Sequence, residues 1–332
     1  MCCAVLCCAV LYAALLSSAD SLFSPPHPTP DILDKEEAGK TTFIINDEGI
    51  MDSLATVLSH EMVKFNKLLL RCASSLTNMK KAIKGLVVMS KDLDRMYTNI
   101  LNNRVPAIWT TVSYSSLKPL ASWVEDLQFR INFMRRWLRS GKPSAFPLPL
   151  FFFPQGFLTG ALQNHARKFA VPINALTFNF TVLEIAGVNE IEEAPENGVY
   201  VFGLHLEGAK WSSANKQIEE ASVGEMYSPL PPVWFVSLSR ASKGRDNPRD
   251  AQCEATLTRT PHARPWTQLP EKDYERDVSD YSCPTYQTSV RAGKLSTTGV
   301  STNYVLSVDL KTSKPTEWWT FKGTALLCNL DN

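Results

Sequence analysis

Apolar residues change their spacing along the chain on either side of the stretch 151–169. Before it they recur every three or four positions, which indicates amphipathic helices, and after it they mostly alternate with polar residues, which indicates strands. The pattern predicts an α+β fold in which an N-terminal helical subdomain is followed by an antiparallel β-barrel-like subdomain. We place these subdomains at residues 46–170 and 171–332.

The helical part divides into three predicted helices, at about 46–71, 75–97 and 120–138. Gly85 is expected to be a point of close packing, and no charged residue is expected on the apolar stripes. Residues 102–117 are predicted to break the helical pattern, since Pro106 interrupts it. The third helix ends with Arg135, Arg136 and Arg139, which either form a partner-binding patch or, as we favour, offset the helix dipole and face solvent.

The stretch 151–169 joins the two parts. Three phenylalanines are expected to be buried, and Pro154 ends their run. An amphipathic helix is predicted from Phe157 to Phe169, with His165 on its apolar side.

Several strands are predicted after this junction. Residues 176–183 alternate, and Asn197-Gly198 marks a turn before a strand that places alternate apolar residues on one face. A further strand enters through prolines at 230–236, and a Gly/Ser/Thr turn joins two strands between 281 and 310. Trp318 and Trp319 are expected in an exposed turn or short helix, and the segment 323–330 should form a buried final strand. The face predicted for the strand after Gly198 comprises Tyr200, Phe202, Leu204 and Leu206.

Two segments fall outside this pattern. Residues 239–280 are polar, charged and aperiodic, so we predict a disordered insertion in which Cys253 and His262 have no assigned role. Residues 1–45 open with an apolar run from Cys2 to Leu16, which has the length of a signal-peptide core but no preceding Lys or Arg. A Pro-rich loop follows, and two alternatives stay open for the apolar run: a signal or anchor, or a truncated or wrongly assigned N-terminus.

Composition narrows the class of protein only slightly. The chain has 332 residues, 44% apolar and 20% charged, with a formal net charge of +1. This is an ordinary globular balance that gives no electrostatic argument for nucleic acid binding. Four of the eight cysteines lie within the first eight residues, and the others are far apart without a C-x-x-C pair, so we interpret them as reduced structural residues.

Candidate chemistry is sparse, and we predict no catalytic, cofactor-binding or metal-binding residues. Gly39-Lys40-Thr41-Thr42 lacks the earlier glycine of a phosphate loop and no strand leads into it. His205 has no histidine nearby in sequence, which favours a structural role. The sequon at Asn179 matters only in a secreted chain, and it falls within a predicted strand.

Motifs in both halves nevertheless resemble, in the right order, the C-terminal domain of axonemal dynein heavy chains. The resemblance covers about residues 46–330, and the long 239–280 segment, a retained intron or an insertion, departs from it. The segments that carry it are EMVKFNKLL, KAIKGLVVMS, YSSLKPLASWVEDLQFRI, FFFPQGFLTGALQNHARK, ENGVYVFGLHLEGAKW, CPTYQTS, RAGKLSTTGVSTNYV, PTEWW and KGTALLCNL.

The resemblance implies a non-catalytic, structural and regulatory segment of an ATP-driven, minus-end-directed microtubule motor in cilia or flagella. In that family the ATP sites lie in an AAA+ ring and microtubules bind at a stalk, so the expected partner is the ring, with Trp318-Trp319 docking on it. Intermediate chains, light chains and microtubules would be reached only through the parent motor, in the cytoplasm and the axonemal cytoskeleton. The alternatives are a secreted β-rich binding module with a signal peptide and a stand-alone enzyme, which lacks any recognisable motif.

Overall fold

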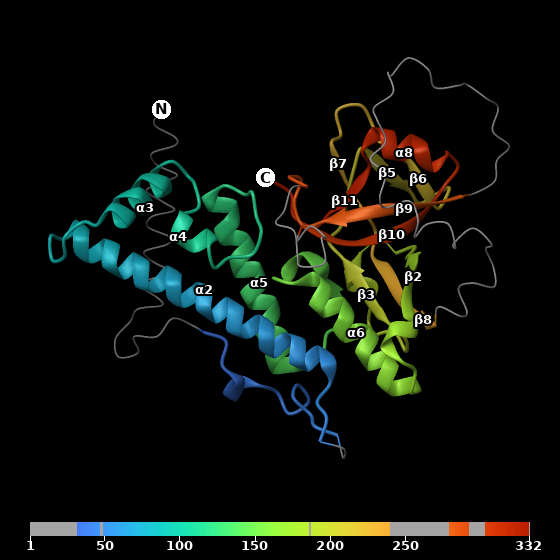
Figure 1. Ribbon diagram of the computed structural model, residues 1–332, viewed down its shortest axis with the longest axis horizontal. Coiled ribbons are helices and arrows are strands. Elements are labelled where there is room, and N and C mark those ends of the chain that lie inside the picture. The colour runs from blue at the N-terminus through green and yellow to red at the C-terminus, as the bar shows by residue number, and fades with distance from the viewer. Residues whose placement is uncertain (1–31, 47–48, 186, 240–278, 292–302, 332) are drawn as a thin grey trace.

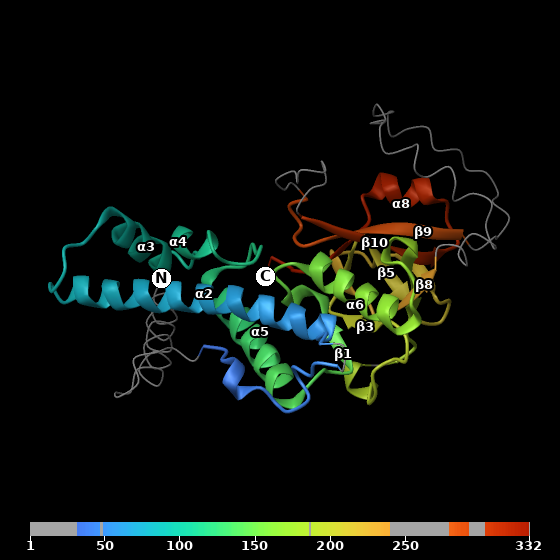
Figure 2. The ribbon, with the colours of Figure 1, turned by 60° about the horizontal axis from the view of Figure 1, so that its bottom comes forward.

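The structure, a computed structural model, describes residues 32–46, 49–185, 187–239, 279–291 and 303–331. Helices occupy one end of the molecule, two sheets occupy the other, and α6 (Pro154–Phe169) lies between them (Figures 1 and 2). The predicted α+β class, with helices first and strands afterwards, is confirmed. The apolar run 2–16, most of the predicted insertion with Cys253 and His262, and the predicted turn at 292–302 lie outside the described residues.

One long helix, α2 (Ser53–Ile83), runs through the break predicted between residues 71 and 75, and the helix predicted at 75–97 is instead interrupted at 84–90, before α3 (Lys91–Leu101). Asp52 caps its first turn by accepting backbone hydrogen bonds from Leu54 (2.7 Å) and Ala55 (3.2 Å). No helix-breaking residue separates the two predicted segments, so the helix continues. Gly85, with φ +70°, follows its end, and nothing lies within 4 Å of the position a Cβ would take there. The expected close packing at Gly85 was therefore wrong. The helices of this end are α2 (Ser53–Ile83), α3 (Lys91–Leu101), α4 (Ala107–Thr110) and α5 (Leu120–Ser140).

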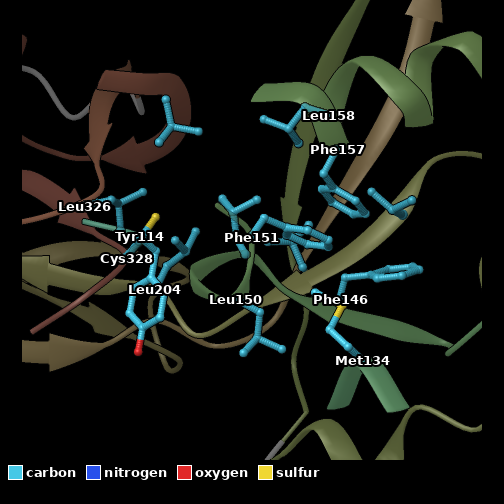
Figure 3. Close-up of a cluster of buried hydrophobic side chains, with 14 of the residues drawn as sticks. Tyr114, Met134, Phe146, Leu150, Phe151, Phe157, Leu158, Leu204, Leu326 and Cys328 are labelled. Carbon is cyan, nitrogen blue, oxygen red and sulfur yellow. The ribbon is translucent and has the colours of Figure 1, made fainter. Parts of the chain in front are cut away.

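The phenylalanine run leads directly into α6. Pro154 is the first residue of this helix, where its missing N–H costs nothing. Phe151 is buried and stacks on Phe157 with ring centroids 4.3 Å apart, but Phe153 is 53% exposed. The expectation that all three phenylalanines are buried was therefore wrong for Phe153. Figure 3 shows side chains from the helices, the junction and the strands meeting in one core, among them Tyr114, Phe151, Leu204 and Leu326.

The strands form two sheets. The four-stranded sheet has the order β1 (Ala145–Pro147), β3 (Val199–Phe202), β8 (Val233–Ser239) and β2 (Leu176–Val182). The other sheet has seven strands whose two edge strands contact each other, so it is barrel-like and nearly closed. Its order is β5 (Ala209–Ser212), β6 (Gln217–Glu220), β10 (Tyr304–Thr312), β9 (Ser279–Tyr286), β11 (Ala325–Leu327), β4 (His205–Glu207) and β7 (Tyr227–Pro229).

Not every strand pair is antiparallel. β1 runs parallel to β3, β6 to β10 and β9 to β11, whereas the other pairs between described strands are antiparallel. The pairing of β1 with β3 brings residues that precede α6 into a sheet built mostly from residues after it. The division predicted at residue 170 stays a prediction.

The single strand expected after Gly198 is broken into three. Gly203 (φ +82°) and Gly208 (φ +73°) adopt left-handed backbone conformations that separate β3, β4 and β5. The chain therefore passes from one sheet to the other at Gly203, and the face that β3 buries carries Val199 and Val201. The predicted single face of Tyr200, Phe202, Leu204 and Leu206 was wrong, because a period of two cannot reveal a change of sheet.

Helix α8 (Thr316–Lys322) occupies the predicted site of an exposed turn or short helix. Trp319 is fully buried there, and its indole N–H donates to Thr312 Oγ1 at 2.7 Å. It cannot dock on another module, so that expectation was wrong for Trp319. The final strand β11 is buried, as predicted. Within the described ranges, no helix combines the length and the apolarity needed to cross a membrane.

Candidate functional site

Reactive side chains are dispersed over the described part of the chain. No three His, Cys, Asp or Glu side chains gather there as a metal ion would require. Burial, helped by the charge of Lys118, lowers the pKa of His205, which lies partly buried on β4. This imidazole is therefore neutral at physiological pH. The absence of catalytic residues and the structural role of His205 stay predictions.

Of the cysteines within the described residues, Cys283 and Cys328 are buried and Cys72 is half-buried. Burial raises the pKa of Cys72 and of Cys328 to about 12 and also raises that of Cys283. All three are free, and a thiol with a raised pKa is a poor nucleophile at neutral pH. The interpretation of these cysteines as reduced structural residues stays a prediction.

The Gly39-Lys40-Thr41-Thr42 segment closes the end of α5. The backbone N–H of Gly39 (2.9 Å) and the hydroxyl of Thr42 (2.7 Å) both donate to the carbonyl of Leu138. These two hydrogen bonds satisfy a carbonyl group at the end of α5 that has no partner within the helix, so the segment has a structural role. Arg139 at the same helix end pairs with Glu37 at 2.6 Å, so it holds the short 3-10 helix η1 (Lys35–Glu37).

A cavity of about 410 Å³ lies beside this segment, between the start of α2 and the ends of α5 and α6. Its lining includes Asp52, Asn164 and Arg167. Asn164 donates to the Asp52 carboxylate at 3.0 Å, and Arg167 donates to the carbonyl of Met51 at 3.1 Å. These polar groups tie α6 to the first turn of α2, so they are engaged in structure.

The most elaborate polar arrangement is a cluster around Arg130, on the buried side of α5. Arg130 is fully buried, although the sequence predicted no charge on this stripe. Its guanidinium donates to Asp126 (2.7 Å), to the side-chain oxygen of Asn329 (2.7 Å) and to the carbonyl of Pro149, and it lies 3.7 Å from the ring centroid of Tyr114. One side chain thus joins α5, the segment before α6 and the residues beyond β11.

Asn329 links the contacts of Arg130 to the seven-stranded sheet. Its amide donates to the carbonyl of Gln287 at 3.0 Å, and its backbone N–H donates to the same carbonyl at 2.9 Å. The end of β11 is thereby attached to the end of β9 as well as to α5. We name Tyr114, Asp126, Arg130 and Asn329 the Arg130 cluster.

A second buried charge holds the phenylalanine run. Glu61 on α2 is 2% exposed and accepts a hydrogen bond from the backbone N–H of Phe152 at 2.7 Å, with Lys64 Nζ 3.4 Å away. Burial raises the pKa of Glu61, and the hydrogen bond and Lys64 oppose that rise. The carboxylate therefore fixes the junction to the longest helix.

Sequence reasoning missed both buried charges. Arg130 stands three positions after Leu127 and four before Met134, and both of these apolar residues lie on the buried side of α5. Glu61 precedes Met62 on the stripe of α2. The sequence did contain a signal for both, because each charged residue stands at the three- or four-residue spacing of the apolar residues on its helix. The Arg130 cluster and Glu61 together hold three segments of the chain in fixed relative positions.

Comparison with known proteins identifies relatives of nearly the whole chain. A family model for the C-terminal domain of the dynein heavy chain matches residues 21–328. Rat "Dynein axonemal heavy chain 1" is 42% identical over 280 residues, 84% of this chain and 6% of that protein. Human "Dynein axonemal heavy chain 6" is 38% identical over 320 residues, 91% of this chain and 7% of that protein.

The match begins at residue 21, although similarity was expected only from about residue 46. The structure gives a reason, because Leu33 is buried and exchanges two 2.8 Å hydrogen bonds with the side chain of Asn66. The segment before α2 is therefore packed against it. The chain spans only about 6–7% of the length of these relatives.

Proposed function

Because the chain belongs to the family formed by the C-terminal domains of dynein heavy chains, we propose that it acts as a structural and regulatory segment of an axonemal dynein motor and not as an enzyme by itself. The single observation that carries this proposal is the family match over residues 21–328, with 38–42% identity to axonemal heavy chains. The segment would brace the AAA+ ring of such a motor and influence its force and its processive movement along microtubules.

The Arg130 cluster supports this role, because a bracing element must resist relative movement of its own parts. Charge-assisted hydrogen bonds from one fully buried guanidinium reach a helix, the junction and the end of the last strand. Partners other than the ring, such as intermediate chains, light chains and microtubules, would be reached through the parent motor. The place of action would be the axoneme of a cilium or flagellum.

The test is reconstitution with the motor domain of a relative. The rat axonemal heavy chain 1 ring and stalk, prepared without their own C-terminal segment, would be purified with and without this chain. We expect stable association and a change in microtubule gliding velocity, whereas this chain alone should hydrolyse no ATP. Failure to associate, with gliding unchanged, would contradict the proposal. Glycosylation of the secreted protein at Asn179 would instead favour the β-rich binding module.

A further inference from the structure

The cavity of about 410 Å³ beside residues 39–42 has an apolar floor. Leu54, Ala55 and Trp137 line it, and all three side chains are buried. The start of α2, which supplies two of them, lies beside α6 in both ribbon views (Figures 1 and 2). The volume lies within the range of about 300–1,000 Å³ that is typical of small-ligand sites. The cavity is therefore of a size that suits a small molecule.

Two cations from different elements stand on the rim of this cavity. Lys142 follows the end of α5, Arg167 lies in the last turn of α6, and both residues are exposed. Within the described ranges, Lys142 makes no hydrogen bond or ion pair, and Arg167 makes one hydrogen bond, to the carbonyl of Met51 at 3.1 Å. Both side chains therefore keep N–H donors that an anion could use.

The carboxylate of Asp52 also lines the cavity, but both of its oxygens are already engaged. One accepts the backbone N–H groups of Leu54 (2.7 Å) and Ala55 (3.2 Å), and the other accepts the side-chain amide of Asn164 (3.0 Å). Among the described lining residues, two cations and one carboxylate leave an excess of one positive charge. Such a lining is complementary to a monoanion.

Two exposed isoleucines add apolar area at the mouth of the cavity. Ile44 and Ile50 line it but are 56% and 40% exposed, so part of their surface faces water. A ligand with an apolar body would remove this surface from water, which is favourable. The cavity thus combines apolar contact area with cationic donors, the pattern that suits an amphipathic anion.

We propose that this cavity binds a small amphipathic carboxylate, a molecule with a linear apolar chain and one terminal carboxylate group. The apolar chain would lie on the buried floor, while Lys142 and Arg167 would donate charge-assisted hydrogen bonds to the carboxylate at the rim. The ligand would contact the start of α2 and the ends of α5 and α6 together, so its binding would stabilise the folded chain. The site would be present in this chain whether or not the chain acts in a motor.

The test uses the full chain, with its isoleucine methyl groups labelled with carbon-13 for NMR, at neutral pH. The probes are octanoate, octanol and octyltrimethylammonium, each below the concentration at which it forms micelles. We expect octanoate to shift the signals of Ile44 and Ile50 until they saturate, while the signal of Ile83, 48% exposed at the far end of α2, stays in place. Octanol should bind about tenfold more weakly, and octyltrimethylammonium more weakly still, because neither offers an anion to the two cations.

Substitutions separate the contribution of the charge from that of the floor. Lys142→Gln should weaken octanoate binding about three- to tenfold and leave octanol binding unchanged, a difference that a general disturbance of the cavity would not produce. Lys91→Gln, at an exposed cation at the start of α3, is the matched control and should leave both unchanged. Ala55→Phe would fill part of the floor and should weaken both probes about tenfold or more. Thermal unfolding of each variant checks that its fold is intact.

Several results would overturn the proposal. Shifts that do not saturate, or that affect Ile83 as strongly as Ile44 and Ile50, would show non-specific binding of a detergent-like molecule. Equal affinities for octanoate and octanol, or an octanoate affinity that Lys142→Gln leaves unchanged, would show that the rim cations do not bind the carboxylate. The motor ring takes no part in these measurements, so this proposal and the proposed function can fail separately.

Discussion

At the scale of single residues, the two buried charges differ in how they are compensated. Arg130 has a carboxylate, two oxygen acceptors and an aromatic face around it, so its charge is well paired. Glu61 accepts from the backbone N–H of Phe152 at 2.7 Å, is further stabilised by the backbone N–H of Phe153 and lies 3.4 Å from Lys64, but these partners do not offset the cost of its burial. The charged form of Glu61 is therefore less favoured in the folded protein than in the unfolded chain, and its pKa is raised.

This difference predicts a pH dependence. The pKa of Glu61 is raised by burial above its ordinary value of 4.5, so the folded state binds the proton more tightly than the unfolded state does. Its contribution to stability is greatest below that value and is lost as pH rises through the folded pKa. Glu61→Gln keeps an acceptor for Phe152 without the charge, so it should be at least as stable as the wild type at neutral pH. Urea unfolding between about pH 5 and pH 8 would measure the difference, which should shrink as the pH falls.

Glu61→Ala is the matched contrast. It leaves the N–H of Phe152 without a partner in the core, so it should cost about 1–3 kcal/mol of unfolding free energy. Equal losses from the Gln and Ala variants at neutral pH would show that the charge itself stabilises the fold, contrary to the argument.

At the scale of elements, the Asn197-Gly198 turn shows a position where only glycine fits. Gly198 has φ +79°, and a Cβ there would lie 1.9 Å from the carbonyl oxygen of Phe235 on β8. Gly198→Ala should therefore cost at least about 3 kcal/mol in chemical denaturation, since strain and backbone displacement add together. Gly224→Ala is the control, because φ is +87° but the surrounding space is open, and it should cost about 1–2 kcal/mol. Equal costs would mean that the close approach to β8 is relieved cheaply.

The elements that the sequence predicted well are those whose pattern is local. Apart from the buried Arg130, the stripe on α5 agrees with the structure, and so do the alternation in β2 and the turn at Gly198. Each of these patterns depends on neighbouring residues. The change of sheet at Gly203 depends on tertiary packing, which a short pattern does not contain. The break predicted between residues 71 and 75 was wrong for a local reason, because no helix-breaking residue stands there. The Arg130 cluster could not be predicted from a local pattern either, because Arg130 and Asn329 are 199 positions apart in the sequence.

At the scale of the whole molecule, the helical end and the sheets are joined by a core and by the Arg130 cluster. The core merges side chains of both ends, as Tyr114 and Leu326 show in Figure 3. The cluster adds directional bonds between α5 and the last strand. Because of the shared core and the cluster, we expect the helical end and the sheets to unfold as one cooperative unit. The order of helices and strands in the sequence alone suggests two parts.

The Arg130 cluster permits a direct test of that coupling. Arg130→Ala leaves Asp126 and Asn329 without their buried partner, so it should lower the unfolding free energy by about 3–5 kcal/mol. In a double-mutant cycle with Asn329→Ala, we expect a coupling energy of about 1–3 kcal/mol.

In the Arg130→Ala variant, hydrogen exchange should accelerate in both α5 and β9, because the cluster binds both, and should change little in the distant α3. Arg136→Ala, at an exposed position of the same helix, is the control and should fall within about 0.5 kcal/mol of wild type. Additive effects, with faster exchange confined to α5, would show that the two ends are held together by the apolar core alone.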